Sequence, residues 1–331
     1  MDSRMLLSVR ELSVEFPILE GGVARVVDGV SFDVAPGEIV ALVGESGCGK
    51  TLTGLALLDL VPPPGRISGG SVVFEGRDLL ALPERELLHV RGGGIGLVFQ
   101  EPGAALDPVR TIGSELVAVL RRHKGIDRKA ARREALEWLH RVSLPDPERR
   151  FDDLPHRMSG GMRQRAMIAL ALAGGPRLLV ADEPTTALDV TIQAQILELL
   201  LDLRRELSLA VLLVTHDLGV VAETADRVLV MYAGEIVESA SARDLFAKPA
   251  HPYTRGLLAS RPDAGEGVHG GRLPSLEGAV PEPGRRPAGC AFEPRCGEAF
   301  GRCRAARPSL IPVSGIPSEA ACFLWDRESA T

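Results

Sequence analysis

The stretch Gly44-Glu-Ser-Gly-Cys-Gly-Lys50-Thr51 decides the fold prediction, because it matches the glycine-rich pattern that binds nucleotide phosphates. Triphosphate binding requires successive backbone N–H groups to turn inward, and glycines permit the dihedral angles that this needs. We expect Lys50 to reach the β- and γ-phosphates and Thr51 to ligate Mg²⁺. The stretch, called the phosphate loop below, therefore predicts a site for ATP or GTP.

The elements around the phosphate loop have the order that such a loop requires. Glu38–Val43 is a short apolar run of strand length, and Thr51–Leu60 takes up helical spacing directly after the glycines. A loop between a strand and a helix presents free backbone N–H groups at the helix N-terminus, where they bind anions. This context supports the prediction beyond the pattern itself.

Further along the chain, apolar runs of strand length alternate with segments of helical spacing. We expect Asp127 to cap one helix, because its carboxylate accepts hydrogen bonds from free helical N–H groups. Such alternation predicts an α/β fold whose mainly parallel sheet is covered by helices on both faces. The expected strands are Leu6–Phe16, Val27–Val34, Gly69–Phe74, Gly94–Phe99, Leu178–Ala181, Ala210–Thr215 and Arg227–Tyr232. The expected helices are Ile112–His123, Asp127–Val142, Gly161–Ala173 and Thr191–Leu207.

The composition of the 331 residues is that of a globular protein, with 45% hydrophobic and 25% charged residues. The 38 basic and 44 acidic residues give a net charge of −6, which offers no electrostatic footprint for nucleic acid. No stretch reaches the roughly 18 apolar residues of a membrane span, and the N-terminus lacks a signal-peptide pattern. We therefore expect a cytoplasmic chain whose role at a membrane would come through a partner.

Several polar residues follow predicted strands. The run before Asp182 and Glu183 is apolar, so both carboxylates stand at the end of a strand, as Gln100 and His216 do elsewhere. Asp182 suits the Mg²⁺ shell, and Glu183 is placed to orient or deprotonate an attacking water. An isolated histidine is usually structural, so the weight given to His216 depends on the other motifs.

Ser159-Gly160-Gly161-Met-Arg-Gln164 precedes a long predicted helix. Ser159 as N-cap, followed by two glycines, leaves free N–H groups at a helix start, which is an anion site. Taken alone, the stretch is equally well explained as a capped helix. Its meaning comes from the order of the motifs: the phosphate loop, Gln100, Ser-Gly-Gly, the two carboxylates and then His216.

In that order of motifs, residues 6–260 resemble the nucleotide-binding subunit of an ABC transporter. The resemblance implies a P-loop NTPase (RecA-like) ABC cassette with an antiparallel β subdomain and a helical subdomain at about 103–158. It implies that Gln100 contacts Mg²⁺ and links the site to a transmembrane partner. It also implies that Glu183 is the catalytic base and that His216 steadies the γ-phosphate during hydrolysis.

The resemblance assigns nucleotide contacts to further residues. Thr186-Ala-Leu-Asp189 resembles the D-loop, and Phe16 is the candidate for stacking on adenine, with a core-facing strand residue as the alternative. Ser159, Gly160 and Gly161 would cap the γ-phosphate bound on the opposite subunit. The expected contacts within one subunit are Gly44, Glu45, Ser46, Gly47, Cys48, Gly49, Lys50, Thr51 and Leu52.

Four of the five cysteines gather near the end of the chain, after a Gly- and Pro-rich segment at 261–289 that we interpret as a linker or irregular arm. The four are Cys290, Cys296, Cys303 and Cys322. Four thiolates in a reducing compartment can hold tetrahedral Zn²⁺ or a [4Fe–4S] cluster, and spacing alone does not separate the two. The remaining Cys48 stands where such phosphate loops more often carry serine; we expect a benign small residue, with a thiol-sensitive loop as the alternative.

The segment 290–331, together with Lys248-Pro-Ala-His-Pro-Tyr-Thr254, resembles the tail of the dipeptide and oligopeptide importer ATPases. That resemblance implies a [4Fe–4S] cluster on the four tail cysteines, for which we favour a structural role over redox sensing. It implies two permease subunits, a second homologous ATPase or a homodimer, and indirectly an extracytoplasmic binding protein, at the cytoplasmic face of the membrane. The alternatives are a non-peptide cargo (nickel chelate, oligosaccharide or opine) and a soluble ABC ATPase acting on nucleic acid or ribosomes.

Overall fold

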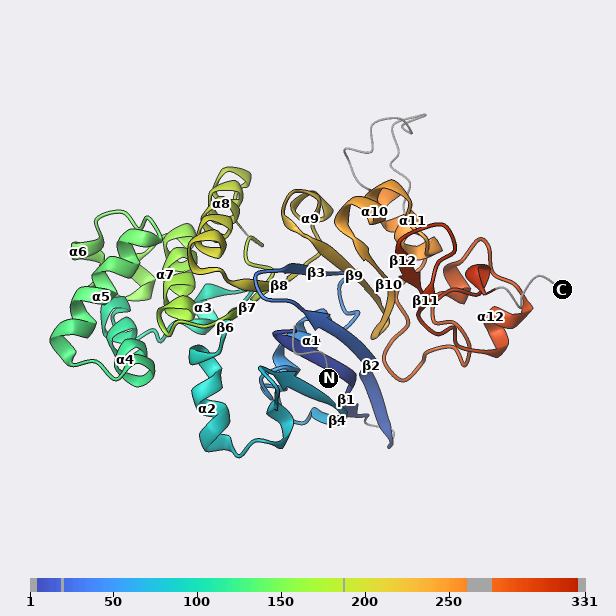
Figure 1. Ribbon diagram of the computed structural model, residues 1–331, viewed down its shortest axis with the longest axis horizontal. Helices are drawn as coiled ribbons and strands as arrows, with labels where there is room; N and C mark the ends of the chain where they lie inside the picture. The colour runs from blue at the N-terminus through green and yellow to red at the C-terminus, as the bar shows by residue number, and fades with distance from the viewer. Residues whose placement is uncertain (1–4, 19–20, 187, 261–275, 327–331) are drawn as a thin grey trace. The chain divides into compact units, whose positions relative to one another are not determined.

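The computed structural model describes residues 5–18, 21–186, 188–260 and 276–326 (Figure 1). The chain divides into two compact units, neither of which is continuous in sequence. The first unit comprises Met1–Leu6, Val34–Glu38 and Asp78–Leu213, and the second comprises Leu7–Asp33, Ile39–Arg77 and Val214–Thr331. Each unit is described by itself below.

A four-stranded sheet with the order β2-β1-β4-β5 occupies the N-terminal part of the second unit. In β1, buried positions such as Leu7 and Val9 alternate with less buried ones, which is the pattern of a strand with one covered face. β1 and β4 pair antiparallel with a register shift between Arg10 and Val14. The strands are β1 (Leu7–Pro17), β2 (Val23–Val34), β4 (Arg66–Phe74) and β5 (Arg77–Asp78).

The phosphate loop follows a different sheet of the second unit, whose strands have the order β11-β12-β10-β9-β3. The pair β3 and β9 is parallel, and β9, β10, β12 and β11 are joined by antiparallel pairing. The strands are β3 (Ile39–Val43), β9 (Arg227–Tyr232), β10 (Glu235–Ser241), β11 (Ile311–Pro312) and β12 (Ser318–Ala320). The helices of this unit are α1 (Lys50–Ala56), α9 (Leu218–Thr224), α10 (Ala242–Ala247), α11 (Pro252–Ala259) and α12 (Gly301–Ala305).

Strands in the first unit have the order β8-β7-β6, with β6 and β7 parallel. Every residue of β7 and β8 is buried, as expected for parallel strands covered on both faces. The strands are β6 (Ile95–Val98), β7 (Leu178–Asp182) and β8 (Ala210–Thr215). The helices are α2 (Glu84–Gly93), α3 (Pro102–Ala105), α4 (Ile112–Lys124), α5 (Arg128–Arg141), α6 (Pro147–Arg150), α7 (Gly160–Ala173) and α8 (Val190–Leu207). Short 3-10 turns complete the chain: η1 (Leu79–Ala81), η2 (Pro155–Arg157), η3 (Glu293–Arg295) and η4 (Phe323–Trp325).

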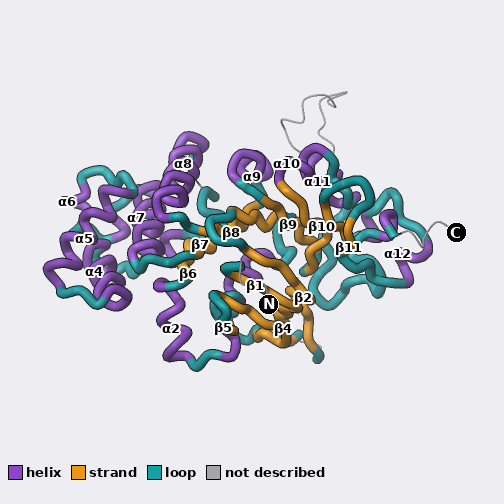
Figure 2. The backbone as a smooth tube through the Cα atoms, in the orientation of Figure 1, coloured by secondary structure: helices purple, strands orange, loops and turns teal. Residues whose placement is uncertain are grey.

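Helices α4, α5 and α7 pack together in the first unit, where Figure 2 shows them as neighbouring purple tubes. Side-chain caps fix where they begin: Thr111 accepts a hydrogen bond from the N–H of Ser114, and Asp127 accepts from Lys129 and Ala130. The predicted capping role of Asp127 is therefore confirmed. Gly125, in the left-handed region at φ 67°, ends α4.

The expected strands and helices agree closely with the structure in the middle of the chain. The predictions for Ala210–Thr215 and Arg227–Tyr232 are confirmed to the residue. The helix expected to extend to Leu60 instead ends at Ala56, because Asp59 takes a positive φ of 51° and interrupts helical backbone. Strand β4 begins three residues before the expected Gly69.

The predicted linker and the residues after it belong to the second unit. Residues 276–289 contain no helix or strand, whereas 261–275 lie outside the described residues. Strand β12 then pairs antiparallel with β10, Ala320 lying opposite Glu238. Ala291 and Phe292 belong to the same hydrophobic cluster as Val43 of β3. Contacts within the second unit therefore connect the cysteine-bearing tail to the strand that leads into the phosphate loop.

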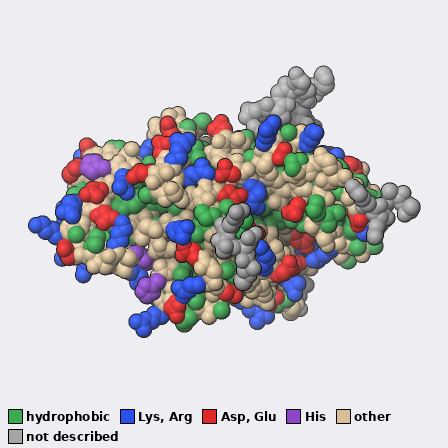
Figure 3. All heavy atoms as spheres, viewed as in Figure 1, with side chains coloured by type: hydrophobic (Ala, Val, Ile, Leu, Met, Phe, Trp, Pro, Cys, Tyr) green, Lys and Arg blue, Asp and Glu red, His purple; other side chains and the backbone are tan. Residues whose placement is uncertain are grey.

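Two properties of the surface bear on possible partners. None of the helices among the described residues combines the length and apolarity needed to cross a bilayer. On the face drawn in Figure 3, Lys and Arg side chains are interspersed with Asp and Glu side chains. That mixture fits the small net charge of −6.

Candidate functional site

The Lys50 side chain lies inside the phosphate loop and hydrogen-bonds to its backbone. Its Nζ donates hydrogen bonds to the carbonyl oxygens of Gly44 at 2.9 Å and Glu45 at 3.0 Å, and the side chain is buried. A buried ammonium is stable only where acceptors replace its lost water, and two loop carbonyls do so here. The loop therefore wraps around the lysine, with the cationic group held at the centre of the curve.

At two positions of the loop, neighbouring backbone lies so close that only glycine fits. Gly44 passes so near to β9 that a Cβ there would lie 2.2 Å from the carbonyl oxygen of Met231. Gly49 caps α1 in a left-handed conformation at φ 107°, and its Cβ would lie 2.9 Å from the carbonyl oxygen of Val26. A side chain at either position would collide with backbone, so these glycines are fixed by packing as well as by the turn.

The other predicted phosphate-loop residues divide into exposed and buried sets. Ser46 and Gly47 form the exposed tip, and Thr51 is exposed in the first turn of α1. Leu52 is half-buried one residue further along the helix. The structure thus places backbone N–H groups and one hydroxyl, that of Thr51, at the start of a helix, as the sequence predicts for an anion site.

Cys48 lies inside the loop and not on its surface. Its side chain is 1% exposed, and its Sγ lies 3.9 Å from the Lys50 Nζ. Burial raises the pKa of the Cys48 thiol, and the nearby Lys50 charge only partly offsets this effect. A buried, protonated thiol reacts slowly, which favours the benign interpretation over a thiol-sensitive loop.

Glu183 is held by two hydrogen bonds at the end of β7. Gln100 donates from Nε2 to its Oε2 at 3.0 Å, and Thr186 donates from Oγ1 to the same oxygen at 2.8 Å. Asp182, the preceding residue, is buried as the last residue of β7. The structure therefore brings together three residues of the first unit that the sequence assigned to hydrolysis and Mg²⁺ binding: Gln100, Asp182 and Glu183.

The backbone at Glu183 adopts a conformation that non-glycine residues rarely take, with φ at 44°. Such left-handed residues cost about 1–3 kcal/mol and persist where neighbouring contacts hold them. Two glutamines supply such contacts to the loop after β7. Gln164 of α7 donates to the Pro184 carbonyl at 2.6 Å, and Gln193 of α8 donates to the Thr185 carbonyl at 3.0 Å.

Helix α7 begins at the predicted Ser-Gly-Gly stretch. The Ser159 hydroxyl accepts a hydrogen bond from the N–H of Met162, which confirms Ser159 as the N-cap. Gly160 is exposed, and a Cβ on it would make only ordinary contact. A Cβ on Gly161 would lie 2.9 Å from Cγ2 of Ile192 in α8, so glycine is required there by helix packing.

Asp189 and His216 lie at element ends, as the order of motifs predicts. Asp189 caps α8 by accepting from the Ile192 N–H at 3.0 Å, and its side chain is exposed. Ala187, between Thr186 and Asp189 of the expected D-loop, lies outside the described residues. His216 is exposed directly after β8.

Phe16 packs against the backbone of the second unit. It stands near the end of β1, and a Cβ on Gly65 would lie 2.3 Å from its ring. The ring is half-buried, so one part of it is covered and another part is open to solvent. Its role as an adenine-stacking residue stays a prediction.

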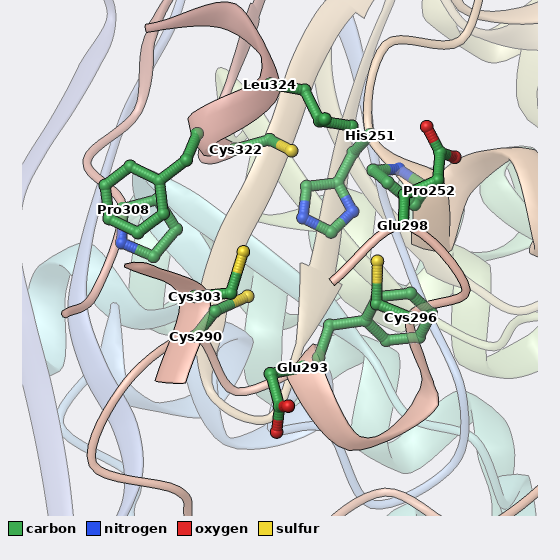
Figure 4. Close-up of a pocket in the computed structure, with 12 residues that line it drawn as sticks. His251, Pro252, Cys290, Glu293, Cys296, Glu298, Cys303, Pro308, Cys322 and Leu324 are labelled. Carbon is green, nitrogen blue, oxygen red and sulfur yellow. The ribbon is translucent and has the colours of Figure 1, made fainter. Parts of the chain in front are cut away.

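Four cysteine side chains from different parts of the tail line one pocket, here called the four-cysteine pocket. They are Cys290, Cys296, Cys303 and Cys322. Figure 4 shows the four sulfurs pointing into the same space, with His251 and Glu298 at its border. The N–H of Cys290 donates to the carbonyl of Cys303 at 2.8 Å, which fixes two of these residues beside each other. The structure thus brings together all four thiols that the sequence predicted as ligands.

Burial raises the pKa of three thiols of the pocket, those of Cys290, Cys296 and Cys322, the last to about 11. Neighbouring cysteines add to each shift, because several thiolates in one pocket repel one another. Among the described residues, no three His, Cys, Asp or Glu side chains are arranged to ligate a single metal ion.

Two side chains that support the phosphate loop were not predicted from the sequence. The Tyr253 hydroxyl accepts from the Glu45 N–H at 2.9 Å, and Arg295 forms an ion pair with the Glu45 carboxylate at 2.6 Å. Both partners are more than 200 residues away along the chain, at separations of 208 and 250. The only local hint is that Arg295 immediately precedes a predicted ligand, Cys296.

Comparison with protein families gives two matches at separate parts of the chain. Residues 27–186 match the family described as ABC transporter. Residues 237–303 match the family described as oligopeptide/dipeptide transporter, C-terminal region. The first match includes the phosphate loop and the β7 carboxylates, and the second includes three of the four tail cysteines.

Curated relatives are similar over nearly their whole length. The dipeptide transport ATP-binding protein DppD of Haemophilus influenzae is 48% identical over 305 residues, covering 92% of each chain. The oligopeptide transport ATP-binding protein AppD of Bacillus subtilis is 49% identical over 305 residues, again covering 92% of each chain. Among solved structures, the dimeric ATP-binding cassette MJ0796, bound to ADP and phosphate after hydrolysis, aligns with a TM-score of 0.64 and 28% identity. That alignment covers 72% of this chain and 99% of the cassette.

Proposed function

This chain belongs to the ABC transporter family, and from that premise we propose that its ATP hydrolysis energises the import of dipeptides or oligopeptides. One observation carries the peptide assignment: residues 237–303 match the C-terminal region of oligopeptide and dipeptide transporters. Relatives named for dipeptide and oligopeptide transport support it at 48% and 49% identity. ATP and Mg²⁺ are the ligands expected of an ABC ATPase.

The phosphate loop binds the nucleotide in this proposal. Inward-facing N–H groups of Gly44–Thr51 surround the phosphates, and Lys50 contributes its charge to the β- and γ-phosphates. Phe16 stacks on the adenine ring with its exposed part. Thr51, Gln100 and Asp182 hold Mg²⁺, since a hydroxyl, an amide and a carboxylate supply the oxygen ligands that this ion prefers.

Glu183 acts as the general base for hydrolysis. Its carboxylate orients the attacking water and takes a proton from it, while His216 contacts the γ-phosphate. The hydrogen bonds from Gln100 and Thr186 to Oε2 fix the direction of this carboxylate. Because Gln100 bonds directly to the base, movement of the segment after β6 changes the orientation of the base as well.

Two copies of this site require two ATPase subunits facing head to tail. Each composite site takes the phosphate loop, the β7 carboxylates and His216 from one subunit. It takes Ser159, Gly160 and Gly161, with the D-loop Asp189, from the other. The solved relative MJ0796 is dimeric, which supports such a pairing. The partner is a homologous ATPase or a second copy of this chain.

Two permease subunits receive the motion in this proposal. The segment that begins at Gln100 and the helical subdomain at about 103–158 form the coupling surface. Val109, in that segment, is 81% exposed, which leaves an apolar side chain available to a partner. The chain then lies peripherally at the cytoplasmic face of the cell membrane, and an extracytoplasmic binding protein delivers the cargo to the permeases.

The four-cysteine pocket holds a [4Fe–4S] cluster. Its ligands are Cys290, Cys296, Cys303 and Cys322, all of which line the pocket. Raised thiol pKa values mean that binding releases protons, and the positive irons remove the repulsion between neighbouring thiolates. Ligation of one cluster by all four cysteines would join the loops of the tail to one another. We assign it a structural role because short elements such as η3 and α12 have little core of their own.

Anaerobic affinity purification of the chain from native membranes tests the proposal. We expect two polytopic permeases and a cassette ATPase to co-purify, and the associated binding protein to retain labelled dipeptides or oligopeptides. A binding protein that retains only nickel chelates, sugars or opines would replace the peptide cargo. Recovery as a lone soluble protein, or with nucleic acid or ribosomes, would overturn the transporter assignment.

A further inference from the structure

Arg295 connects the tail to the phosphate loop through a partly buried ion pair. Its Nη1 lies 2.6 Å from Oε2 of Glu45, and its Nη2 lies 3.0 Å from Oε1. Only 5% of the arginine side chain is exposed. Two parallel hydrogen bonds between a guanidinium and a carboxylate fix both groups in direction as well as in distance.

The same arginine is held in place from the tail side. Its Nε donates to the Glu277 carbonyl at 2.8 Å, and its guanidinium lies 5.7 Å from the Tyr232 ring centroid and 6.0 Å from that of Phe292. Phe292 also lines the four-cysteine pocket, and Arg295 immediately precedes Cys296. One of the two rings beside the guanidinium, and the residue that follows Arg295 in the chain, therefore both line the four-cysteine pocket.

Glu45 occupies a sensitive position in the phosphate loop. Its carbonyl accepts a hydrogen bond from the Lys50 Nζ, and its N–H donates to the Tyr253 hydroxyl. Tyr253 in turn packs against Phe292 with the two rings tilted and their centroids 5.4 Å apart. Glu45 therefore forms hydrogen bonds through its side chain, its N–H and its carbonyl. The partners of the side chain and the N–H, Arg295 and Tyr253, pack in or against the tail.

On the basis of the proposed nucleotide site, we infer that Arg295 is a positioning residue through which the four-cysteine pocket sets the nucleotide affinity of the phosphate loop. A change that disorders the pocket displaces Arg295, releases the Glu45 carboxylate and lets the curve around Lys50 relax. Loss of one partner also leaves the other charge partly buried without its counter-ion, which is costly. By thermodynamic reciprocity, nucleotide binding in turn stabilises the pocket.

A double-mutant cycle on nucleotide affinity tests the first half of this connection. Dissociation constants for a fluorescent ATP analogue are measured for Arg295→Ala, Glu45→Gln and the double variant. We expect each single variant to raise the dissociation constant by roughly fivefold or more. The dissociation constant of the double variant should not exceed the larger of the two single-variant values. Arg295→Lys, which keeps the charge but loses the paired hydrogen bonds, gives a second measurement should Arg295→Ala fold poorly.

Arg285→Ala is the matched control. Arg285 also forms an ion pair with a glutamate, Glu282, at 3.2 Å, but 77% of its side chain is exposed and neither residue lines the four-cysteine pocket. We expect its dissociation constant to equal that of the unmodified protein. Equal affinities for Arg295→Ala, Arg295→Lys and Arg285→Ala would overturn the inference. Losses in the two single variants that multiply in the double variant would overturn it as well.

The second half of the connection requires a change in the pocket itself. Cys296→Ser is introduced alone and together with Glu45→Gln, and nucleotide affinity is measured in both. We expect Cys296→Ser alone to weaken nucleotide binding. Added to Glu45→Gln, it should weaken binding no further than Glu45→Gln does by itself. If Cys296→Ser leaves nucleotide affinity unchanged in both the unmodified protein and Glu45→Gln, or lowers it by the same factor in both, the pocket does not act through Glu45. Lys50→Ala separates the proposals: if it leaves binding intact, the proposed nucleotide site is itself wrong.

Discussion

Gln100 donates a hydrogen bond to Glu183 at 3.0 Å, joining the second residue after β6 to the first residue after β7. Strands β6 and β7 are parallel neighbours, so their carboxyl ends lie at the same edge and the two side chains meet there. This contact places the expected link to the permeases in direct contact with the expected catalytic base. It predicts that a disturbance at Gln100 alters hydrolysis without altering the fold.

Glu183→Gln removes the base while preserving the shape of the side chain. We expect ATP hydrolysis to fall by about 10²–10⁴-fold, the range of general-base contributions, while nucleotide binding is retained. Phosphate release and the affinity for an ATP analogue measure the two effects separately. Glu198→Gln, at an exposed position on α8, is the control and should hydrolyse ATP normally. Unchanged hydrolysis in Glu183→Gln would remove this residue from the mechanism.

Gly161→Ala tests why the start of α7 carries glycine. The new methyl group would lie 2.9 Å from Ile192 Cγ2, so α7 and α8 must separate or shift. We expect reduced ATPase activity and a lower melting temperature. Combination with Ile192→Ala, which removes the colliding methyl group, should restore much of both.

Gly160→Ala provides a comparison at the neighbouring position, where the nearest side-chain atom, on Leu188, would be 3.6 Å away. Its melting temperature should stay close to that of the unmodified protein. A Gly161→Ala variant that remains fully stable would contradict the packing explanation. Failure of Ile192→Ala to restore activity to an otherwise stable double variant would point instead to a direct contact of Gly161 with nucleotide.

The buried His251 predicts a loss of stability in acid. Burial lowers its pKa to about 3, whereas an unfolded histidine titrates near 6.5. Because the folded pKa is depressed, the contribution is fully present above about pH 6.5 and is lost as pH falls from there toward the folded pKa. Its Nδ1 accepts from the Tyr253 N–H at 3.0 Å, a bond that protonation would break.

His251→Asn isolates this contribution. Asparagine retains an acceptor at the N-cap of α11 but does not titrate in this range. The free energy of unfolding, measured against pH below 6.5, should fall less steeply in the variant than in the unmodified protein. Equal slopes for the variant and the unmodified protein would contradict the assigned burial effect.

The four-cysteine pocket predicts bound iron and sulfide in equal amounts after anaerobic purification. Serine in place of Cys290, Cys303 or Cys322 should lower both contents together, because each thiolate supplies one cluster ligand. Cys48→Ser should leave both contents unchanged, since this thiol lies in the phosphate loop and outside the pocket. Zinc without sulfide would establish the alternative metal, and the absence of any metal would contradict the proposed role of the pocket.

Local patterns predicted those parts of the fold that neighbouring residues determine. The caps at Asp127 and Ser159 and the strands β8 and β9 follow from side-chain type and apolar runs, and the structure confirms them. The ion pair between Arg295 and Glu45 was not predictable in this way, because its partners are 250 residues apart. Long-range pairs depend on how sheets and loops pack, as when β12 joins β10.

ATP-dependent peptide uptake by the assembled transporter tests the central claim most directly. The chain is purified with its co-purifying subunits, placed in lipid vesicles and supplied with ATP, Mg²⁺, the binding protein and a labelled dipeptide or oligopeptide. We predict uptake against a concentration gradient that stops when Lys50→Ala replaces the unmodified chain. Uptake that persists with Lys50→Ala, or ATP hydrolysis that moves no peptide of any length tested, would contradict the assignment of this chain as the ATPase of a peptide importer.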